Sequence, residues 1–232
     1  MSTAHSKDDD QQSFKAAAAR AAAEEVREAM TLGLGSGSTA EEFVRLLAQS
    51  PHASTVRCTC TSARTEKLAR SLGIEILRLA DVIPIDLAVD GADEIDHDLR
   101  LIKGRGGALL REKIVEQQAR RFIVIADGSK VVERLGAGTL PIEVTPFAQE
   151  VLMATFDYLK LLPVLRRVEG APFVTDEGNR IIDVRVPDEG DIADIVAEIR
   201  SHAGVVETGF FPTEATEAVI ADANGVWRMR RD

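Results

Sequence analysis

Residues 30–39 read MTLGLGSGST, a short apolar segment that runs directly into a glycine loop. We expect a strand at about Met30–Leu34, then the loop, and a helix from Thr39 onward. Ser38 and Glu41 stand three residues apart just before an apolar run, which is the signature of a helix N-terminal capping box. A strand that ends in a glycine loop at the start of a helix is typical of α/β proteins.

Strands and helices alternate along the chain on both sides of this loop. The further predicted elements are a helix at Phe14–Met30, strands at Thr55–Thr61, Ile74–Leu79, Leu87–Asp90 and Phe122–Ala126, and helices at Ala63–Leu72 and Leu109–Arg121. Continuous runs of Val, Ile and Leu that are bounded by helices indicate a parallel sheet covered on both faces. We therefore predict an α/β protein with a Rossmann-like, mostly parallel sheet, whose ligands gather at the carboxyl ends of the strands.

The pattern changes at about Thr139. The elements predicted there are strand Pro141–Val144, helix Phe147–Leu161, strands Val164–Val168 and Arg180–Val186, helix Ile192–Ser201 and strand Val205–Glu207. This β-α-β-β-α-β order is ferredoxin-like. A final hairpin around Asn224 and Gly225 is expected to return to the first sheet. The predicted divisions are a disordered tail at 1–13, a Rossmann-like catalytic domain at 14–138, an inserted ferredoxin-like α+β lid domain at 139–207 and a return segment at 208–232.

Charge and composition exclude several classes of partner. The chain has 28 Lys and Arg against 38 Asp and Glu, a net charge of −10 that would repel nucleic acid. No uncharged apolar stretch approaches the ~20 residues of a membrane span. Met1–Gln12 lacks the apolar core of a secretory signal, so we expect a cytoplasmic protein without membrane association. Cys58 and Cys60, with four scattered histidines, suit neither a disulfide framework nor a zinc site, and no metal is expected.

The glycine loop is compatible with a phosphate site. A dinucleotide fingerprint would place glycine where Ser38 stands, and a Walker loop would need a lysine that is absent. What remains is a loop that opens a helix, with Ser36, Ser38 and Thr39 adding hydroxyls to exposed amides, an arrangement that suits a single phosphate. A tight turn without any ligand is an equally weighted alternative for this loop taken alone.

Three further segments end at the same predicted sheet edge. They are Asp90–Asp96 (DGADEID), Lys103–Lys113 (KGRGGALLREK) and Asp127–Lys130 (DGSK). Taken singly, the first segment fits a solvated acidic turn, Glu112 in the second a surface glutamate, and Lys130 in the third a solvated lysine. The first segment is not a calcium loop, because the sixth position after a candidate first acid is not glycine. Together, several carboxylates and lysines beside a phosphate-type loop, with no metal motif and no nucleophile triad, suit proton transfer next to a carbonyl.

These segments resemble the type A ribose-5-phosphate isomerase family. The matching stretches are Gly33–Thr39, Asp90–Asp96, Lys103–Val115, Ala126–Lys130, Leu140–Val144, Thr175–Asn179 and Glu207–Gly209. They follow in order and at family-like spacing from about Lys15 to the C-terminus. The resemblance implies interconversion of D-ribose 5-phosphate and D-ribulose 5-phosphate through an enediolate, in the non-oxidative pentose phosphate pathway and without a cofactor. It also implies a homodimer or homotetramer.

The resemblance further implies a role for each matching residue. Glu112 would move a proton between C2 and C1, and Lys103 would stabilise the oxyanion. Asp90 would help to open the furanose ring, and Asp93 would hold sugar hydroxyls. The implied substrate-binding residues are Ser36, Gly37, Ser38, Thr39, Asp90, Gly91, Ala92, Asp93, Lys103, Gly104, Arg105, Gly106, Lys130 and Lys15.

Two other classes of protein share this type of fold. A sugar-phosphate-sensing domain would need no proton shuttle, so Glu112 and Lys103 argue against it. An acyl-CoA transferase-like enzyme would need a glutamate nucleophile in a different loop.

Arg105 stands where many family members have glycine, which bears on how the loop packs against the substrate. Glu116→Gln, one turn beyond Glu112, is expected to stay near wild type.

Overall fold

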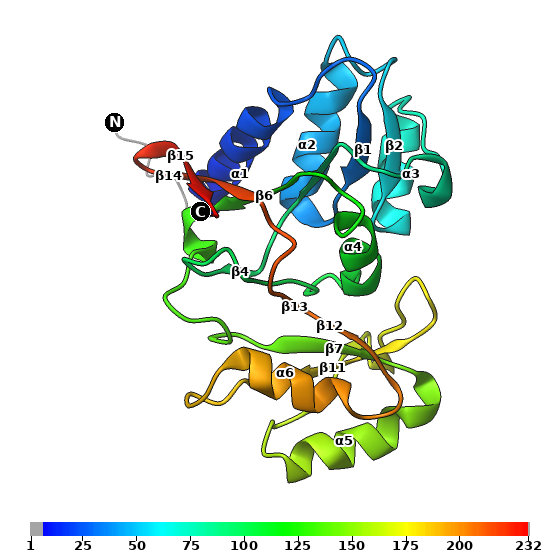
Figure 1. Cartoon of the computed structure of the whole chain (residues 1–232), viewed down its shortest axis with the longest axis vertical. Helices are drawn as coiled ribbons and strands as arrows, with labels where there is room; N and C mark the ends of the chain where they lie inside the picture. The colour runs from blue at the N-terminus through cyan, green and yellow to red at the C-terminus, as the bar shows by residue number, and fades with distance from the viewer. Residues whose placement is uncertain (1–6, 232) are drawn as a thin grey trace.

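The fold is seen in a computed structural model that describes residues 7–231 (Figure 1). Its largest sheet has the strand order β15-β14-β6-β3-β1-β2. The strands are β1 (Thr31–Leu34), β2 (Arg57–Cys60), β3 (Leu87–Asp90), β6 (Phe122–Asp127), β14 (Glu217–Asp222) and β15 (Gly225–Arg230). All neighbours are parallel except the hairpin β14–β15, and β14 pairs with β6. The predicted mostly parallel α/β fold is confirmed, and the final hairpin returns to the first sheet.

The strands of this sheet send alternate side chains to its two faces, as the two-residue period of a strand requires. Ile123 and Ile125 pack against helices α1 (Lys7–Ala23) and α2 (Gly37–Gln49) on one face. On the other face, a Cβ added to Gly33 of β1 would lie 2.7 Å from Cγ1 of Val115 in helix α4 (Leu109–Glu116). Helix α3 (Ala63–Ser71) lies beside β2 and α2, and its Ala69 belongs to the same core as α1 and α2. Within residues 7–231, no helix is long and apolar enough to cross a membrane.

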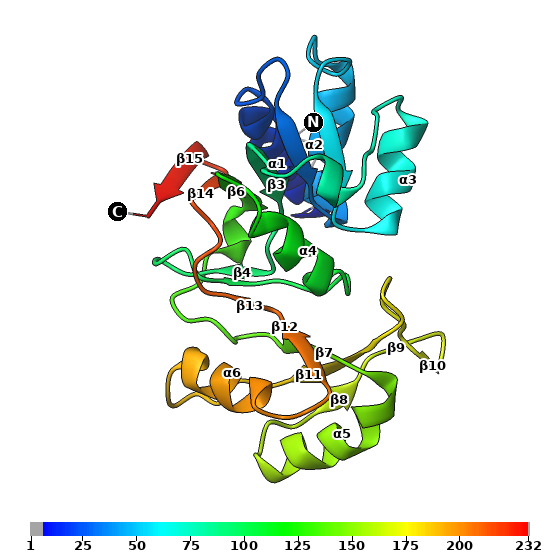
Figure 2. The ribbon, with the colours of Figure 1, turned by 45° about the vertical axis from the view of Figure 1, so that its right-hand side comes forward.

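The second unit is built on an antiparallel sheet with the order β12-β7-β11-β8. Its elements are β7 (Leu140–Val144), α5 (Gln149–Tyr158), β8 (Val164–Leu165), β11 (Arg180–Val184), α6 (Ile192–Arg200) and β12 (Val205–Thr208), with a small hairpin of β9 (Arg167–Val168) and β10 (Ala171–Pro172). Helices α5 and α6 cover the face of this sheet that points away from the larger sheet (Figures 1 and 2). The observed order is the predicted β-α-β-β-α-β arrangement.

A third, small sheet joins the two units. Strand β13 (Phe210–Phe211) follows β12 and pairs with β5 (Leu101–Ile102), which pairs with β4 (Glu94–Ile95). Sequence analysis predicted none of these strands, because two-residue strands are too short for a hydrophobic alternation to be recognised. They tie the second unit to the segment that carries Asp93 and Lys103.

The first helix differs from the prediction at both ends. It begins at Lys7, so residues 7–13, which were expected in a disordered tail, are helical; the rest of that tail lies outside the described residues. Asp9 and Asp10 lie in its first turn, where the helix dipole favours carboxylates. The helix ends at Ala23 rather than Met30, and the chain turns so that Val26 is buried in the core.

Two other local predictions are wrong. The strand predicted at Ile74–Leu79 is reduced to a single bridge between Cys58 and Ile76, followed by the 3-10 turn η1 (Leu79–Asp81). The capping box of Ser38 and Glu41 is not formed either. Helix α2 already begins at Gly37, and Glu41 forms an ion pair with Arg64 at 2.6 Å. The Glu41 side chain is thus held by a residue of α3 rather than by its own helix end.

Candidate active site

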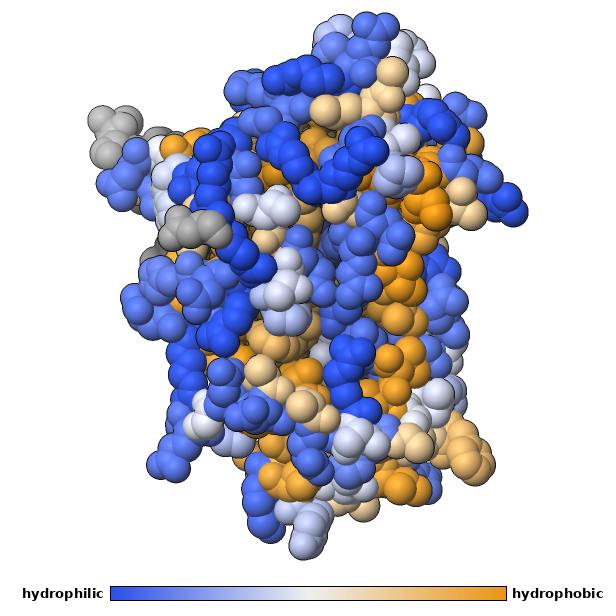
Figure 3. Space-filling model, in the orientation of Figure 1, coloured by the Kyte–Doolittle hydropathy of each residue, from blue (hydrophilic) through white to orange (hydrophobic). Residues whose placement is uncertain are grey.

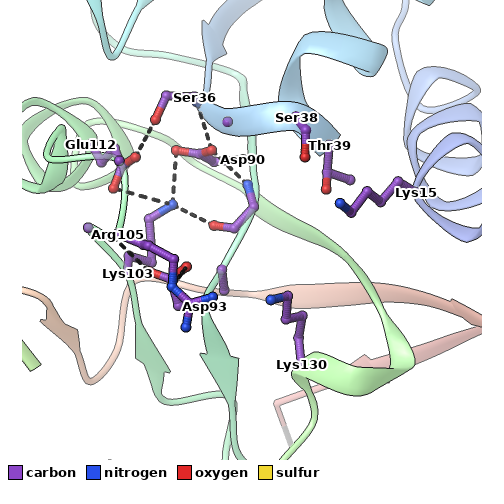
Figure 4. A pocket seen from close by; sticks show the side chains of 15 residues that line it. Lys15, Ser36, Ser38, Thr39, Asp90, Asp93, Lys103, Arg105, Glu112 and Lys130 are labelled. Carbon is purple, nitrogen blue, oxygen red and sulfur yellow. Dashed lines mark hydrogen bonds and ion pairs between the residues drawn. The ribbon is translucent and has the colours of Figure 1, made fainter. Parts of the chain in front are cut away.

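The predicted site residues meet at the carboxyl edge of the six-stranded sheet. Fifteen residues line one pocket of about 360 Å³ (Figure 4). They are Lys15, Ser36, Gly37, Ser38, Thr39, Asp90, Gly91, Ala92, Asp93, Lys103, Gly104, Arg105, Gly106, Glu112 and Lys130. Every site residue named from the sequence lines this pocket. Their individual roles remain predictions.

Asp90 occupies the end of β3, at the centre of the pocket floor. Its Oδ1 accepts hydrogen bonds from the backbone N–H groups of Ser36 at 2.8 Å and of Gly91 at 2.6 Å. The first loop reaches this carboxylate only because residue 35 is glycine. A Cβ on Gly35 would lie 2.2 Å from the carboxyl carbon of Asp90, far inside van der Waals contact.

Lys103 is the single ammonium on the pocket floor among the described residues, and it is buried. Its Nζ lies 2.9 Å from Oδ2 of Asp90 and 3.8 Å from Oε2 of Glu112, and it donates a hydrogen bond to the carbonyl of Gly91 at 2.6 Å. Burial alone would lower the pKa of Lys103. The carboxylates around it, Asp90 first, outweigh that effect and raise the pKa, so the side chain stays charged.

Glu112 lies in the first turn of α4 and points into the pocket (Figure 4). Its Oε1 accepts a hydrogen bond from the hydroxyl of Ser36. Burial raises the pKa of Glu112 to about 7, an effect that the nearby Lys103 only partly offsets. A carboxyl group with a pKa near neutrality is suited both to take and to return a proton.

Glu116 belongs to the same cluster, which sequence analysis missed. The side chain is fully buried, and its Oε1 lies 3.1 Å from Nζ of Lys103. Glu116 therefore lies inside the cluster, and the expectation that Glu116→Gln stays near wild type remains a prediction. The signal was present in the spacing, because residues four apart on a helix lie on the same face.

The opposite end of the pocket is positively charged. Helix α2 begins at Gly37, whose φ of 81° favours glycine, and Ser38 and Thr39 lie in the first turn. The first backbone N–H groups of a helix have no intrahelical acceptor. Lys15 from α1 and Lys130 from the turn η2 (Gly128–Lys130) lie beside this helix end (Figure 4), and neither forms an ion pair with any residue in the described part of the chain. This end suits a phosphate group.

Comparison with known proteins decides which family uses this arrangement. The family model of ribose 5-phosphate isomerase A (phosphoriboisomerase A) matches residues 57–225. The chain belongs to the ribose 5-phosphate isomerase A family. Members of this isomerase family interconvert ribose 5-phosphate and ribulose 5-phosphate, so the family resemblance inferred from the sequence is confirmed.

Relatives and solved structures of the isomerase family match the chain over nearly its whole length. The ribose-5-phosphate isomerase A of Agrobacterium fabrum is 46% identical over 232 residues, covering 95% of this chain and 99% of the relative. A D-ribose-5-phosphate isomerase solved in complex with phospho-erythronic acid has a TM-score of 0.91 at 36% identity, covering 95% of this chain and 99% of that one. The enzyme of Methanocaldococcus jannaschii has a TM-score of 0.89 at 35% identity, covering 94% and 99%.

In this member of the isomerase family, a residue of the second unit holds the pocket loop. Nη1 of Arg166 donates hydrogen bonds to the carbonyls of Gly104 at 2.7 Å and Arg105 at 2.9 Å. The guanidinium is itself held by Asp183, at 2.9 Å from Nε to Oδ2. On the other side of the loop, the backbone N–H of Arg105 donates to Asp93 at 2.9 Å, while the Arg105 side chain is largely exposed. Sequence analysis missed Arg166 because no local pattern marks it.

The two cysteines do not belong to the pocket. They lie in β2, and burial raises the pKa of both Cys58 and Cys60 to about 12, so neither is a thiolate at neutral pH. In residues 7–231, no group of three or more His, Cys, Asp or Glu side chains is arranged to hold a metal ion. The chemistry of the described pocket is that of carboxylates and lysines.

Proposed function

We propose that the chain interconverts D-ribose 5-phosphate and D-ribulose 5-phosphate through an enediolate, without a cofactor, in the non-oxidative pentose phosphate pathway of the cytoplasm. The observation that carries this proposal is the pairing of Glu112, whose pKa is raised to about 7, with the charged Lys103 in one buried pocket. The relative that binds phospho-erythronic acid adds support. The carboxylate of that phosphorylated sugar acid offers two oxygens on a planar carbon, as an enediolate intermediate does on neighbouring carbons.

The proposed reaction begins with ring opening. The phosphate lies at the start of α2, held by the backbone amides and hydroxyls of Ser38 and Thr39 and by the ammonium groups of Lys15 and Lys130. Asp90 takes the proton of the C1 hydroxyl, the bond between C1 and the ring oxygen breaks, and Asp90 passes the same proton to the ring oxygen, which becomes a hydroxyl group. The product is the open-chain aldehyde, whose hydroxyl groups Asp93 holds.

The proposed isomerisation then needs one base and one cation. The Glu112 carboxylate removes the proton from C2, the C1–C2 double bond forms, and the negative charge moves to O1. Lys103 stabilises this oxyanion as a fixed cation in a site with little water. Glu112 returns its proton to C1 while the proton on O2 moves to O1, and the ketose results. Every proton removed is returned, so no oxidant or reductant is required.

We propose that residues 139–207 form a lid domain over a catalytic domain made of residues 14–138 and 208–232. The support lies in the contacts of Arg166 with the loop at Gly104 and Arg105, and in the small sheet that joins the two units. In this arrangement the lid unit helps to shape the end of the pocket that receives the sugar hydroxyls.

We propose that the chain forms a homo-oligomer through the outer face of α5. Large apolar side chains are exposed on α5 and on the 3-10 turn η3 (Pro146–Ala148) before it: Val151 (69%) and Tyr158 (83%) on α5, and Phe147 (100%) on η3. Figure 3 shows hydrophobic surface at the lower end of the molecule, where α5 and α6 lie in Figure 1. Such a patch is typical of an association surface. Sedimentation analysis should find a dimer or tetramer that Val151→Glu dissociates; a wild-type monomer would contradict this proposal.

A coupled assay tests the proposed activity. Ribulose 5-phosphate formation from ribose 5-phosphate is measured in the presence of a metal chelator. We expect full activity in the chelator. Dependence on added metal would overturn the cofactor-free reaction, and ribose 5-phosphate binding without turnover would indicate a sensor domain instead.

A further inference from the structure

Three carboxyl groups surround a single buried ammonium on the pocket floor. Nζ of Lys103 lies 2.9 Å from Asp90, 3.1 Å from Glu116 and 3.8 Å from Glu112. Among the described residues, no other cation forms an ion pair with any of these three groups. With all of them ionised, three negative charges and one positive charge would leave a net −2 on four buried side chains. Burying uncompensated charge is strongly unfavourable, so one carboxyl group must hold a proton.

The hydrogen bonds indicate which group holds the proton. The carboxylate of Asp90 accepts two backbone N–H groups, and Glu112 accepts the hydroxyl of Ser36. Both oxygens of Glu116 are buried, and neither accepts a hydrogen bond of normal geometry in the described part of the chain, although Nζ of Lys103 lies 3.1 Å from Oε1. Burial raises the pKa of Glu116 well above its usual value, and the nearby Asp90 adds to this while Lys103 opposes it.

We propose that Glu116 is a positioning residue whose protonated carboxyl group donates a hydrogen bond to Asp90 and leaves Lys103 free to stabilise the oxyanion. This inference rests on the proposed isomerase function. The acceptor is Oδ2 of Asp90, which lies 2.9 Å from the Lys103 ammonium as an ion pair. This oxygen accepts no hydrogen bond of normal geometry from the described residues, and it lies within reach of the Glu116 carboxyl group. An ionised Glu116 would instead compete with the oxyanion for Lys103.

The proposal predicts a pH dependence of its own. The charged and titratable groups that face Glu116 are Asp90 at the end of β3, Glu112 on α4 and Lys103 after β5. The rings of Phe122 and Phe211 on β6 and β13 flank the same ammonium and carry no charge. As pH rises above the pKa of Glu116, its ionisation adds a negative charge beside Lys103. We therefore expect kcat to fall at alkaline pH.

Two variants distinguish the effect of the Glu116 hydrogen bond from that of its negative charge. Glu116→Leu removes the hydrogen bond to Asp90, and we expect kcat to fall about tenfold with little change in KM, since a lost hydrogen bond to a charged group is of this order. Glu116→Gln keeps a neutral donor, so it should recover most of that kcat and no longer show the alkaline fall. Glu143→Gln, a buried glutamate of the second unit, serves as the control and should keep the wild-type pH profile. A Gln variant as slow as the Leu variant, or one that retains the alkaline fall, would overturn the proposal.

A spectroscopic readout does not depend on turnover. The infrared difference between wild type and Glu116→Gln is recorded about one pH unit above the pKa of Glu112, where Glu112 is ionised. We expect the C=O band of a protonated carboxylic acid in the wild type and its loss in the variant. Absence of this band in the wild type would overturn the proposal even with full isomerase activity. Its presence in a protein without isomerase activity would support protonated Glu116 while the proposed function fails.

Discussion

Glu112 and Asp90 are both buried carboxyl groups at one sheet edge, yet their surroundings differ. Asp90 accepts two backbone N–H groups and lies 2.9 Å from the ammonium of Lys103. Glu112 accepts one hydroxyl and lies 3.8 Å from the same ammonium. Its surroundings therefore offset less of the rise in pKa that burial causes. Two carboxyl groups with different stabilisation can serve different steps of one reaction, and this difference supports the proposed role of Glu112 as the proton carrier.

Glu112→Gln should remove the base without removing the site. Glutamine keeps the size and hydrogen-bonding reach of glutamate, so the variant should fold and bind ribose 5-phosphate. Loss of a general base typically costs about 10²–10⁴ in rate, and we expect this loss in kcat. Exchange of the C2 proton with deuterated solvent measures the step directly. Glu75→Gln, at an exposed position outside the pocket, is the control. Exchange at the wild-type rate in the Glu112 variant would transfer the role of base to Asp90 or Asp93.

The raised pKa of Glu112 has consequences for both activity and stability. The ionised form is the base, so kcat/KM should fall as pH decreases through about 7. The folded protein binds this proton more tightly than the unfolded chain, whose glutamate titrates near 4.5. The associated stability is therefore complete below about 4.5 and lost as pH rises through about 7. Urea unfolding should find Glu112→Gln more stable than wild type above neutrality, with an advantage that shrinks as pH falls. An advantage independent of pH would contradict this origin.

Among the elements, the N-terminus of α2 carries the charge complementarity of the site. Ser36 is the N-cap residue of α2, but its hydroxyl donates to Glu112 rather than capping the helix. Ser38 and Thr39 follow in the first turn, beside Lys15 and Lys130. The N-terminus of α2 thus contributes to both parts of the proposed site. Its N-cap residue Ser36 donates a hydrogen bond to the proposed base, and its first turn faces the proposed phosphate position.

Replacing Ser38 and Thr39 together with alanine should mainly raise KM. Each hydroxyl that binds the charged phosphate is worth about 1.5–3 kcal/mol, or roughly tenfold or more in KM. Because these residues lie away from the pair of Glu112 and Lys103, kcat should change little. Steady-state kinetics test this, with Ser71→Ala on an exposed part of α3 as the control. An unchanged KM would place the phosphate with Lys15 and Lys130 alone.

At the scale of the whole molecule, the second unit supports the pocket from outside. Arg166 joins the backbone carbonyls of the loop at 104–105 to Asp183 of β11. Phe173 packs against Gly107 so closely that a Cβ there would lie 2.3 Å from its ring. The loop that lines the pocket is therefore shaped by residues more than 60 positions further along the chain.

Arg166→Ala should weaken substrate binding without removing any group from the pocket. It deletes two hydrogen bonds to the loop, each from a charged donor and worth about 1.5–3 kcal/mol, so the loop should become less ordered. We expect KM to rise about tenfold and kcat to change less. Arg167→Ala is a matched control, because the exposed Arg167 side chain donates its hydrogen bond to Gly170 of its own hairpin, not to the pocket loop. Equal effects of the two variants would show that Arg166 has no special role in the loop.

Much of this protein can be predicted from local sequence. Buried runs such as Phe122–Ala126 and the glycine loop at 33–38 indicate a parallel sheet, and the carboxyl ends of parallel strands share one edge. That geometric rule placed 35–38, 90–93 and 127–130 at one edge, whereas the role of Glu112 came from the family resemblance. The ferredoxin-like order was predictable because β7, β11, α5 and α6 are long enough to show their periods.

Only the tertiary structure decided what depends on contacts between distant segments. The start of α2 was shifted because Gly35 lets Asp90 approach and bind the N–H of Ser36. Glu116 entered the cluster because packing turned one face of α4 toward Lys103, and Arg166 reached the loop from another sheet. The tertiary structure also determines which buried carboxyl groups hold a proton. Sequence specifies which groups are present, but their desolvation and mutual distances, which set their charge, exist only in the folded chain.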